Sequence, residues 1–164
     1  TFIETCFLHH YGELPDKNQL QVFEEKVIEE MLVHEKIKDF YKGFESDAHP
    51  MAIMCGVVGA LSSFFHDNLD IKNPKQREIT AIKLIAKFPT LAAISFRTSK
   101  GLPLVQPDKK RGYTENFLYM LFADPMDTDF KIPQVMIDAL DKIFILHADN
   151  GAVPVRFSVT FSPF

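Results

Sequence analysis

Cysteine, tryptophan and glycine-rich loops are scarce or missing in this sequence. The 164 residues include two cysteines, seven glycines and no tryptophan. Cys6 and Cys55 lie in apolar stretches with helical spacing, not at the spacings of a disulfide framework, so we expect reduced and buried thiols. Gly56 and Gly59 fall inside a predicted helix and form no phosphate-binding loop. These absences exclude a disulfide-stapled scaffold and a phosphate-loop enzyme.

An excess of positive charge and a long apolar run are missing too. The formal net charge is -4, so nucleic acid or an anionic membrane surface would need a local basic patch. The one candidate patch, residues 109–111, sits in a loop rich in proline and glycine and is interpreted as a solvated turn. The apolar stretch 51–65 is shorter than the about 20 residues of a membrane span. We therefore expect no nucleic-acid partner, no membrane and a soluble protein in a reducing compartment.

Clusters of metal ligands or of catalytic groups are also missing. His9 and His10 are neighbours and project about 100 degrees apart on a helix, which does not suit one shared metal. The other histidines are isolated in the sequence, and the adjacent serines at 62 and 63 have no local base. The sequence predicts no metal site, no cofactor and no nucleophilic catalytic residue, which makes a free-standing metal protein the least favoured of three alternatives. The remaining histidines are His34, His49, His66 and His147.

Apolar residues with helical spacing cover most of the chain. Seven or eight helices without an internal repeat or a linker predict an all-α single unit. The pattern already runs at Phe2 with no N-cap recognised before it, so we expect the chain to start in the middle of an element. Pro89 predicts either one long kinked helix or two helices that abut there. The predicted helices include residues 49–65, which are apolar almost all round, and residues 77–93, 113–122 and 133–146.

The pattern changes after Asp149. From Val153 apolar and polar residues alternate, and this period of two is typical of a strand. We therefore divide the chain into a helical domain, residues 1–149, and a divergent tail, residues 150–164, that contains a predicted β-strand. His147 lies at the end of the last predicted helix. Its residue type and position favour a helix-end histidine that is stabilised by the helix dipole.

Several segments resemble citrate synthase of the bacterial, hexamer-forming type, in the same order along the chain. The resemblance covers nearly all of residues 1–149. The matching segments are Tyr11-Gly-Glu-Leu-Pro, His49-Pro-Met-Ala-Ile-Met-Cys-Gly-Val-Val-Gly-Ala-Leu-Ser-Ser-Phe-Phe-His-Asp, the run from Arg77 to Ala93, Asn116-Phe-Leu-Tyr-Met-Leu-Phe, and the run from Ala139 to Asp149.

The resemblance implies a part of the large helical domain of an enzyme that condenses acetyl-CoA with oxaloacetate to citrate in the tricarboxylic acid cycle. In that family an aspartate base and histidines perform the chemistry, and arginines hold the dicarboxylate. His147 begins the family's His-Ala-Asp-His-Glu-Gln-Asn motif and is our candidate substrate-binding residue. The second histidine of the motif falls on Asn150, and the later catalytic motifs would lie beyond the end of the chain. We therefore expect a truncated chain without catalytic residues of its own.

The resemblance also implies an allosteric nucleotide site. Lys83 and Lys87 match two basic residues of that site. Glu29 and Glu30 stand where the family pattern has arginine and histidine, and their charges would repel a pyrophosphate. Phe65 replaces a tyrosine of the pattern, and Met126 replaces a cysteine.

Two functional interpretations follow. The first is a catalytically incomplete citrate-synthase-like chain, located in the cytoplasm of a bacterium or in the mitochondrial matrix of a eukaryote. The second is a non-catalytic helical module that forms a homodimer or higher oligomer through residues 49–65 and 77–93. The all-round apolarity of the first of these helices, and its stripe of small residues, favour an interface.

Overall fold

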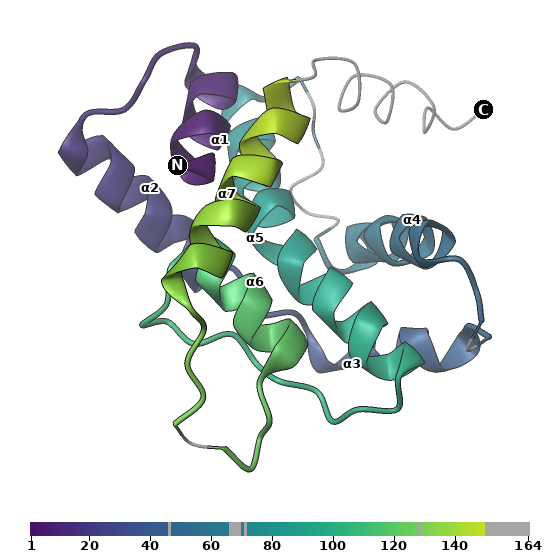
Figure 1. The fold of residues 1–164 in the computed structure, drawn as a ribbon. Coiled ribbons are helices and arrows are strands. Elements are labelled where there is room, and N and C mark those ends of the chain that lie inside the picture. The colour runs from purple at the N-terminus through teal and green to yellow at the C-terminus, as the bar shows by residue number, and fades with distance from the viewer. Residues whose placement is uncertain (46, 66–69, 71, 128, 150–164) are drawn as a thin grey trace.

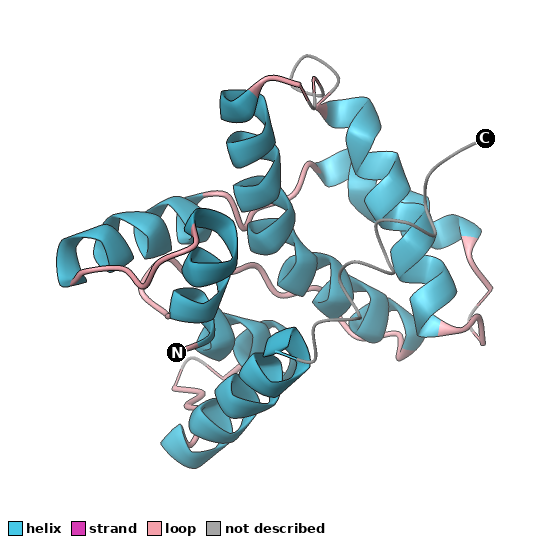
Figure 2. Cartoon of the chain, turned by 90° about the horizontal axis from the view of Figure 1, so that it is seen from above, coloured by secondary structure: helices cyan, strands magenta, loops and turns pink. Residues whose placement is uncertain are grey.

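The computed structural model describes residues 1–45, 47–65, 70, 72–127 and 129–149. This described part is built from helices and loops and contains no strand, as Figure 2 shows. It confirms the all-α prediction. The predicted strand and the predicted tail, residues 150–164, lie outside the described residues. The elements are α1 (Phe2–Tyr11), α2 (Lys17–Glu29), α3 (Glu35–Phe40), η1 (Tyr41–Gly43), α4 (Pro50–Leu61), η2 (Ser62–Phe64), α5 (Pro74–Ser99), α6 (Tyr113–Phe122) and α7 (Gln134–Asp149).

Helix α5 runs through the middle of the molecule (Figure 1). Helices α1, α2 and α7 lie on one side of it in this view, and α3 and α4 lie on the other. The core has two clusters of buried side chains, and α5 contributes to both. Ile82, Ala86 and Ala93 join the first core cluster, with side chains of α1, α2 and α6. Leu91 and Ile94 join the second core cluster, with side chains of α3 and α4.

Polar side chains mark where the helices begin. Thr1 is the N-cap of α1, and its hydroxyl accepts from the amide of Glu4 at 3.3 Å while the Glu4 side chain reaches back to the N-cap backbone. This pair is a capping box. Our prediction that no N-cap precedes this pattern is therefore wrong, because we did not recognise Thr1 and Glu4 as the capping pattern. Asp16 and Gln19 form a second capping box at α2.

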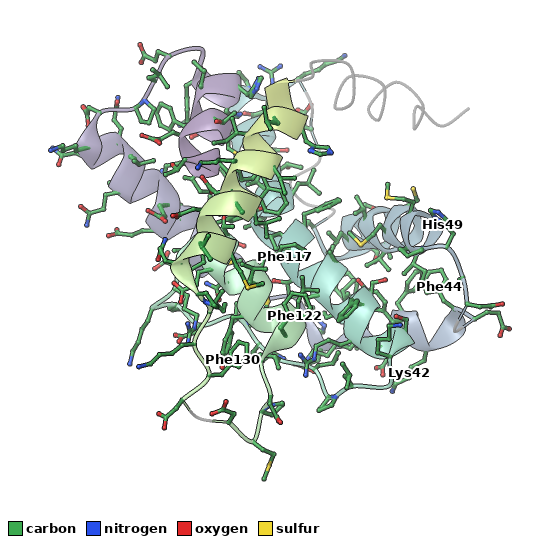
Figure 3. The ribbon with its side chains drawn as sticks, viewed as in Figure 1. Lys42, Phe44, His49, Phe117, Phe122 and Phe130 are labelled. Atoms are coloured by element: carbon green, nitrogen blue, oxygen red, sulfur yellow. The ribbon has the colours of Figure 1, made fainter. Side chains whose placement is uncertain are left out.

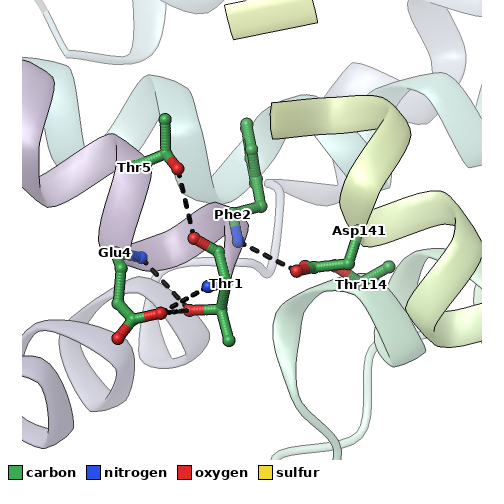
Figure 4. A network of polar contacts seen from close by, with 6 residues as sticks. All are labelled: Thr1, Phe2, Glu4, Thr5, Thr114 and Asp141. Atoms are coloured by element: carbon green, nitrogen blue, oxygen red, sulfur yellow. Dashed lines mark hydrogen bonds and ion pairs between the residues drawn. The ribbon is translucent and has the colours of Figure 1, made fainter. Parts of the chain in front are cut away.

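A carboxylate of α7 holds the beginnings of two other helices. Asp141 accepts from the amide of Phe2 at 3.1 Å and from the hydroxyl of Thr114 at 2.8 Å (Figure 4). Phe2 is the first residue of α1, and Thr114 lies in the first turn of α6. A negative charge is favourable beside the positive end of each helix dipole. Asp141 therefore fixes α7 against both helices with one side chain.

Pro89 lies inside α5, which continues through it as one helix of 26 residues. Of the two alternatives the sequence left open, the single helix is therefore confirmed. Proline has no amide hydrogen, so the carbonyl of Ile85, one turn earlier, has no partner within the helix. The hydroxyl of Tyr113 donates to this carbonyl at 2.8 Å. Burial raises the pKa of Tyr113 above its usual range, which keeps the hydroxyl protonated and able to donate.

Helix α4 buries one side only. Ile53, Met54, Val57 and Leu61 are buried, whereas Met51 is 44% exposed. Within a single chain this apolar helix therefore has one exposed side, and the predicted interface stays a prediction. Gly56 faces inward, because a Cβ there would lie 3.1 Å from the ring of Phe44, and Gly59 has no such neighbour. Of the small-residue stripe, formed by Ala52, Gly56, Ala60 and Ser63, Gly56 thus serves an internal contact, whereas Ala52 is exposed.

By length and apolarity alone, α5 could cross a membrane. Half of its most apolar window is buried inside the protein, however. The core helix of a helical domain meets the same criteria, so this feature is weak evidence for a membrane span.

We expect the substitution Tyr113→Phe to lower the free energy of unfolding by about 1–3 kcal/mol, because it leaves the partly buried carbonyl of Ile85 without a donor. In a Pro89→Ala background the new amide can donate to the same carbonyl, so Tyr113→Phe should cost less there. Urea denaturation of the four variants, followed by circular dichroism, measures both costs. Equal costs in the two backgrounds would contradict this explanation.

Candidate functional site

A groove of about 390 Å³ lies between α2 and α5. Ile79 and Ile82 supply its apolar lining. The charged lining consists of three lysines and three glutamates, namely Lys26, Lys75, Lys83, Glu29, Glu30 and Glu78. Their formal charges cancel, so a nucleotide phosphate would gain no net electrostatic attraction from this set. Lys83, a residue of the predicted nucleotide site, thus lies beside the two glutamates that were expected to oppose it.

Lys87, the second predicted nucleotide residue, is buried and only 4% exposed. Its ammonium donates to the carbonyls of Glu30 at 2.5 Å and Leu32 at 2.8 Å, and it contacts the Glu30 carboxylate at 3.2 Å. An ammonium has three hydrogens, and these three acceptors can use all of them. Lys87 therefore joins α5 to the connection between α2 and α3, and it does not line the groove.

The surroundings of Lys87 act on its charge in opposite directions. Burial lowers the pKa of Lys87, the hydrogen bond and charge of Glu30 raise it, and the nearby charge of Lys83 lowers it. The net effect is a pKa below the usual value. A buried cation is stable in a protein only when its hydrogen bonds are satisfied, and here they are.

Phe65 brings the two lysines together. The Nζ atom of Lys83 lies 4.5 Å from the centroid of the Phe65 ring, and that of Lys87 lies 5.5 Å from it. Three positions of the predicted nucleotide pattern are therefore neighbours in space. Met126, another position of the pattern, is 89% exposed in the loop after α6.

His147 lies in the last turn of α7 and is exposed. Its Nδ1 is 2.9 Å from the carbonyl oxygen of Ile143 in the same helix. A carbonyl only accepts, so Nδ1 carries the hydrogen, and Nε2 remains open to another partner. The position at the negative end of the helix dipole agrees with the helix-end role. An open Nε2 is also what a substrate-binding histidine needs.

A second cavity of about 390 Å³ lies where α1, α5 and α7 meet. Burial, and to a lesser extent the charge of Asp141, raise the pKa of Cys6 to about 12. The thiol is therefore protonated at neutral pH and a poor nucleophile. Cys6 and Cys55 are both free thiols and only partly buried. The cavity is lined by Phe2, Cys6, His9, His10, Ile85 and Ala148.

Metal binding finds no support in the described ranges. Within them, no group of three histidine, cysteine, aspartate or glutamate side chains is arranged to hold an ion. His34 and His49 instead cap helices through Nδ1. His66 lies outside the described residues.

The sequence analysis missed two buried polar residues that position loops. The guanidinium of Arg97, 3% exposed, donates to the carbonyls of Pro103 and Leu121. The side chain of Asn116, fully buried, donates to the carbonyl of Asp108 at 2.9 Å and accepts from its amide at 2.8 Å. Asn116 is a polar residue in an otherwise apolar helical stretch. This contrast is the signal in the sequence that could have identified it.

The basic patch at residues 109–111 is partly neutralised within the protein. Arg111 donates to Glu115 at 2.5 Å and lies 3.6 Å from the carboxylate of Asp108. Its guanidinium also stacks over the ring of Tyr119 at 4.3 Å. This arrangement agrees with a structural turn and gives no sign of a phosphate site.

A family model described as the citrate synthase C-terminal domain matches residues 1–155. The chain belongs to the citrate synthase family. Its fold is similar to the crystal structure of citrate synthase from Thermotoga maritima MSB8, with a TM-score of 0.68 and 25% sequence identity over 89% of this chain and 35% of that chain. It is also similar to citrate synthase from Pyrobaculum aerophilum, with a TM-score of 0.67 and 22% identity over 93% of this chain and 46% of that chain.

These comparisons confirm the resemblance at the level of the family and of the all-α fold. The chain spans 35% and 46% of the two citrate synthases. The family match continues to residue 155, into the range predicted to be a divergent tail. The boundary after residue 149 therefore stays a prediction, as does the assignment to the hexamer-forming type.

We expect Lys87→Met to lower the free energy of unfolding by about 3 kcal/mol, because two carbonyls and a carboxylate lose their donor. Lys83→Met, on the same helix but at the groove, should change it by less than about 1 kcal/mol. Urea denaturation of both variants gives the comparison. Equal losses would show that Lys87 does not hold the α2–α3 connection.

Proposed function

We propose that this chain forms part of the helical domain of a citrate synthase of the bacterial, hexamer-forming type. The family match over residues 1–155 is the observation that supports this proposal most strongly. The reaction would be the condensation of acetyl-CoA with oxaloacetate to give citrate and coenzyme A. The cytoplasm of a bacterium, or the mitochondrial matrix of a eukaryote, would be its location, without a nucleic-acid or membrane partner.

The chemistry of this reaction needs more groups than the described residues bring together. A carboxylate base must remove a proton from the acetyl methyl group, and hydrogen-bond donors must stabilise the enolate oxygen. His147 can serve as one substrate-binding residue through its open Nε2. In the described ranges no carboxylate or second histidine forms a hydrogen bond with it. We infer that this chain is catalytically incomplete by itself.

We infer further that the nucleotide site of the hexamer-forming type is not retained. Lys87 uses its ammonium for Glu30 and Leu32 inside the protein. Lys83 shares its groove with Glu29 and Glu30, whose charges oppose an anionic ligand.

The activity test uses the 164-residue polypeptide with acetyl-CoA and oxaloacetate. We expect no release of coenzyme A above the rate without protein. A complete citrate synthase in the same assay is the positive control. Turnover above background would show that the chain carries catalytic groups that the described residues do not reveal.

The alternative function is a non-catalytic module that self-associates through residues 49–65 and 77–93. Exposed apolar side chains on both helices favour it. Met51 of α4 is 44% exposed, and Leu84 and Phe88, one turn apart on α5, are 41% and 47% exposed. A second copy of the chain could remove these side chains from water.

We expect the isolated chain to form a dimer or a larger oligomer, and Phe88→Lys to shift it toward the monomer because a charge would enter the apolar contact. Leu14→Lys is the matched control, since Leu14 is 70% exposed in the loop between α1 and α2. Multi-angle light scattering measures the mass of each variant. A monomeric unsubstituted chain, or equal effects of the two substitutions, would rule out this interface.

A further inference from the structure

Two histidines act as N-caps. The amide of Lys36 donates to Nδ1 of His34 at 3.1 Å at the start of α3, and the amide of Met51 donates to Nδ1 of His49 at 3.2 Å at the start of α4. A backbone amide can only donate, so each Nδ1 must be an acceptor without a hydrogen. An imidazolium carries hydrogens on both ring nitrogens. Both caps therefore exist only while the rings are neutral.

The two capped helices pack against each other. Val33, Ile37 and Tyr41 from the α3 region share the second core cluster with Ile53 and other residues of α4. Figure 3 shows Phe44 and His49 near the start of α4. The ring of Phe44 is the neighbour that a Cβ at Gly56 would meet. We call residues 34–61 the α3–α4 unit, with the gap at residue 46.

Within the described residues, the contacts of the two rings are with backbone amides and with one aromatic ring. The His34 ring stacks on Phe64 at a centroid distance of 5.0 Å. In the described part of the chain, neither ring contacts a charged side chain. The charged residues near the two histidines in the sequence are Glu35, which is paired with Lys38, and the exposed Lys36 and Asp47. On α5, which packs against α4, Lys83 and Lys87 lie over Phe65. The positive end of a helix dipole faces each ring and disfavours a second positive charge.

Three other histidines lie at the C-terminal ends of helices. His9 and His10 lie in the last turn of α1, and His147 lies in the last turn of α7. A positive charge is favourable at these ends. His147 already donates from Nδ1 to the carbonyl of Ile143, which an imidazolium can also do.

We propose that the α3–α4 unit is an acid-sensitive part of this protein, which loses both of its helix caps when His34 and His49 become protonated, while the ends of α1 and α7 gain stability. Imidazole changes its charge between about pH 8 and pH 5. Loss of one cap lowers the ratio of folded to unfolded helix about fivefold. The acid sensitivity of the α3–α4 unit does not depend on whether the chain has catalytic activity.

The test compares the unsubstituted chain with the double variant His34→Asn, His49→Asn at about pH 8 and pH 5. Asparagine is a good N-cap and does not titrate in this range. Hydrogen exchange measured by mass spectrometry, corrected for intrinsic rates, reports on the peptides that cover α3 and α4. We expect the protection of α4 in the unsubstituted chain to fall about fivefold on acidification, and the double variant to keep its protection.

Two further variants make the result specific. At about pH 8, His49→Ala should already show the loss of α4 protection that the unsubstituted chain shows on acidification, because alanine cannot cap the helix. The control His9→Asn, His10→Asn should show the full acid-dependent loss in α4. The proposal is overturned if the double cap variant loses as much protection as the unsubstituted chain, or if the unsubstituted chain loses none.

Discussion

The structure depends on the hydrogen bonds that α5 gives to the connection between α2 and α3. Lys87 donates to the carbonyls of Glu30 and Leu32, and the hydroxyl of Thr90 donates to the carbonyl of Met31 between them at 2.7 Å. The carbonyls of three consecutive residues thus bind one helix. The last carbonyls of a helix lack partners within it, and a cation there also suits the negative end of its dipole. This anchor sets where α3 begins, and with it the position of the second core cluster.

Pro89 lies between Lys87 and Thr90, and two tyrosines donate to the backbone of α5 around it. Tyr113 donates to the carbonyl of Ile85, and Tyr41 donates to that of Leu91 at 2.8 Å. Tyr41 belongs to the second core cluster and Tyr113 to the first. Helix α5 is therefore tied to both clusters by directed bonds as well as by apolar packing. The break in its own hydrogen-bond ladder is compensated by a side chain from α6.

Local patterns predicted much of this fold. The helix at residues 113–122 has the predicted bounds, whereas α7 begins one residue after the predicted start and ends three residues after the predicted end, at Asp149. The position of the gap between α2 and α3 could not be predicted from local patterns, because the partners that determine it, Lys87 and Thr90, are far away in the sequence. The resemblance alone assigned Lys87 to a nucleotide site, and it carries no information on the burial of that side chain. Spacing by four places Lys83 and Lys87 on one face of a helix, but only the packing of α2 shows which of them is buried.

Membership of the citrate synthase family connects this helical arrangement with a function. The described residues supply the helical scaffold of a citrate synthase fold and one exposed histidine at the end of α7. This scaffold depends on a central α5 that is anchored around Lys87, Pro89 and Thr90. Native-state hydrogen exchange by nuclear magnetic resonance tests it most directly. We predict that the amides of Ala86 to Ile94, apart from Pro89, which has no amide hydrogen, exchange last, through global unfolding. Faster exchange there than in α1 or α6, by local opening, would contradict it.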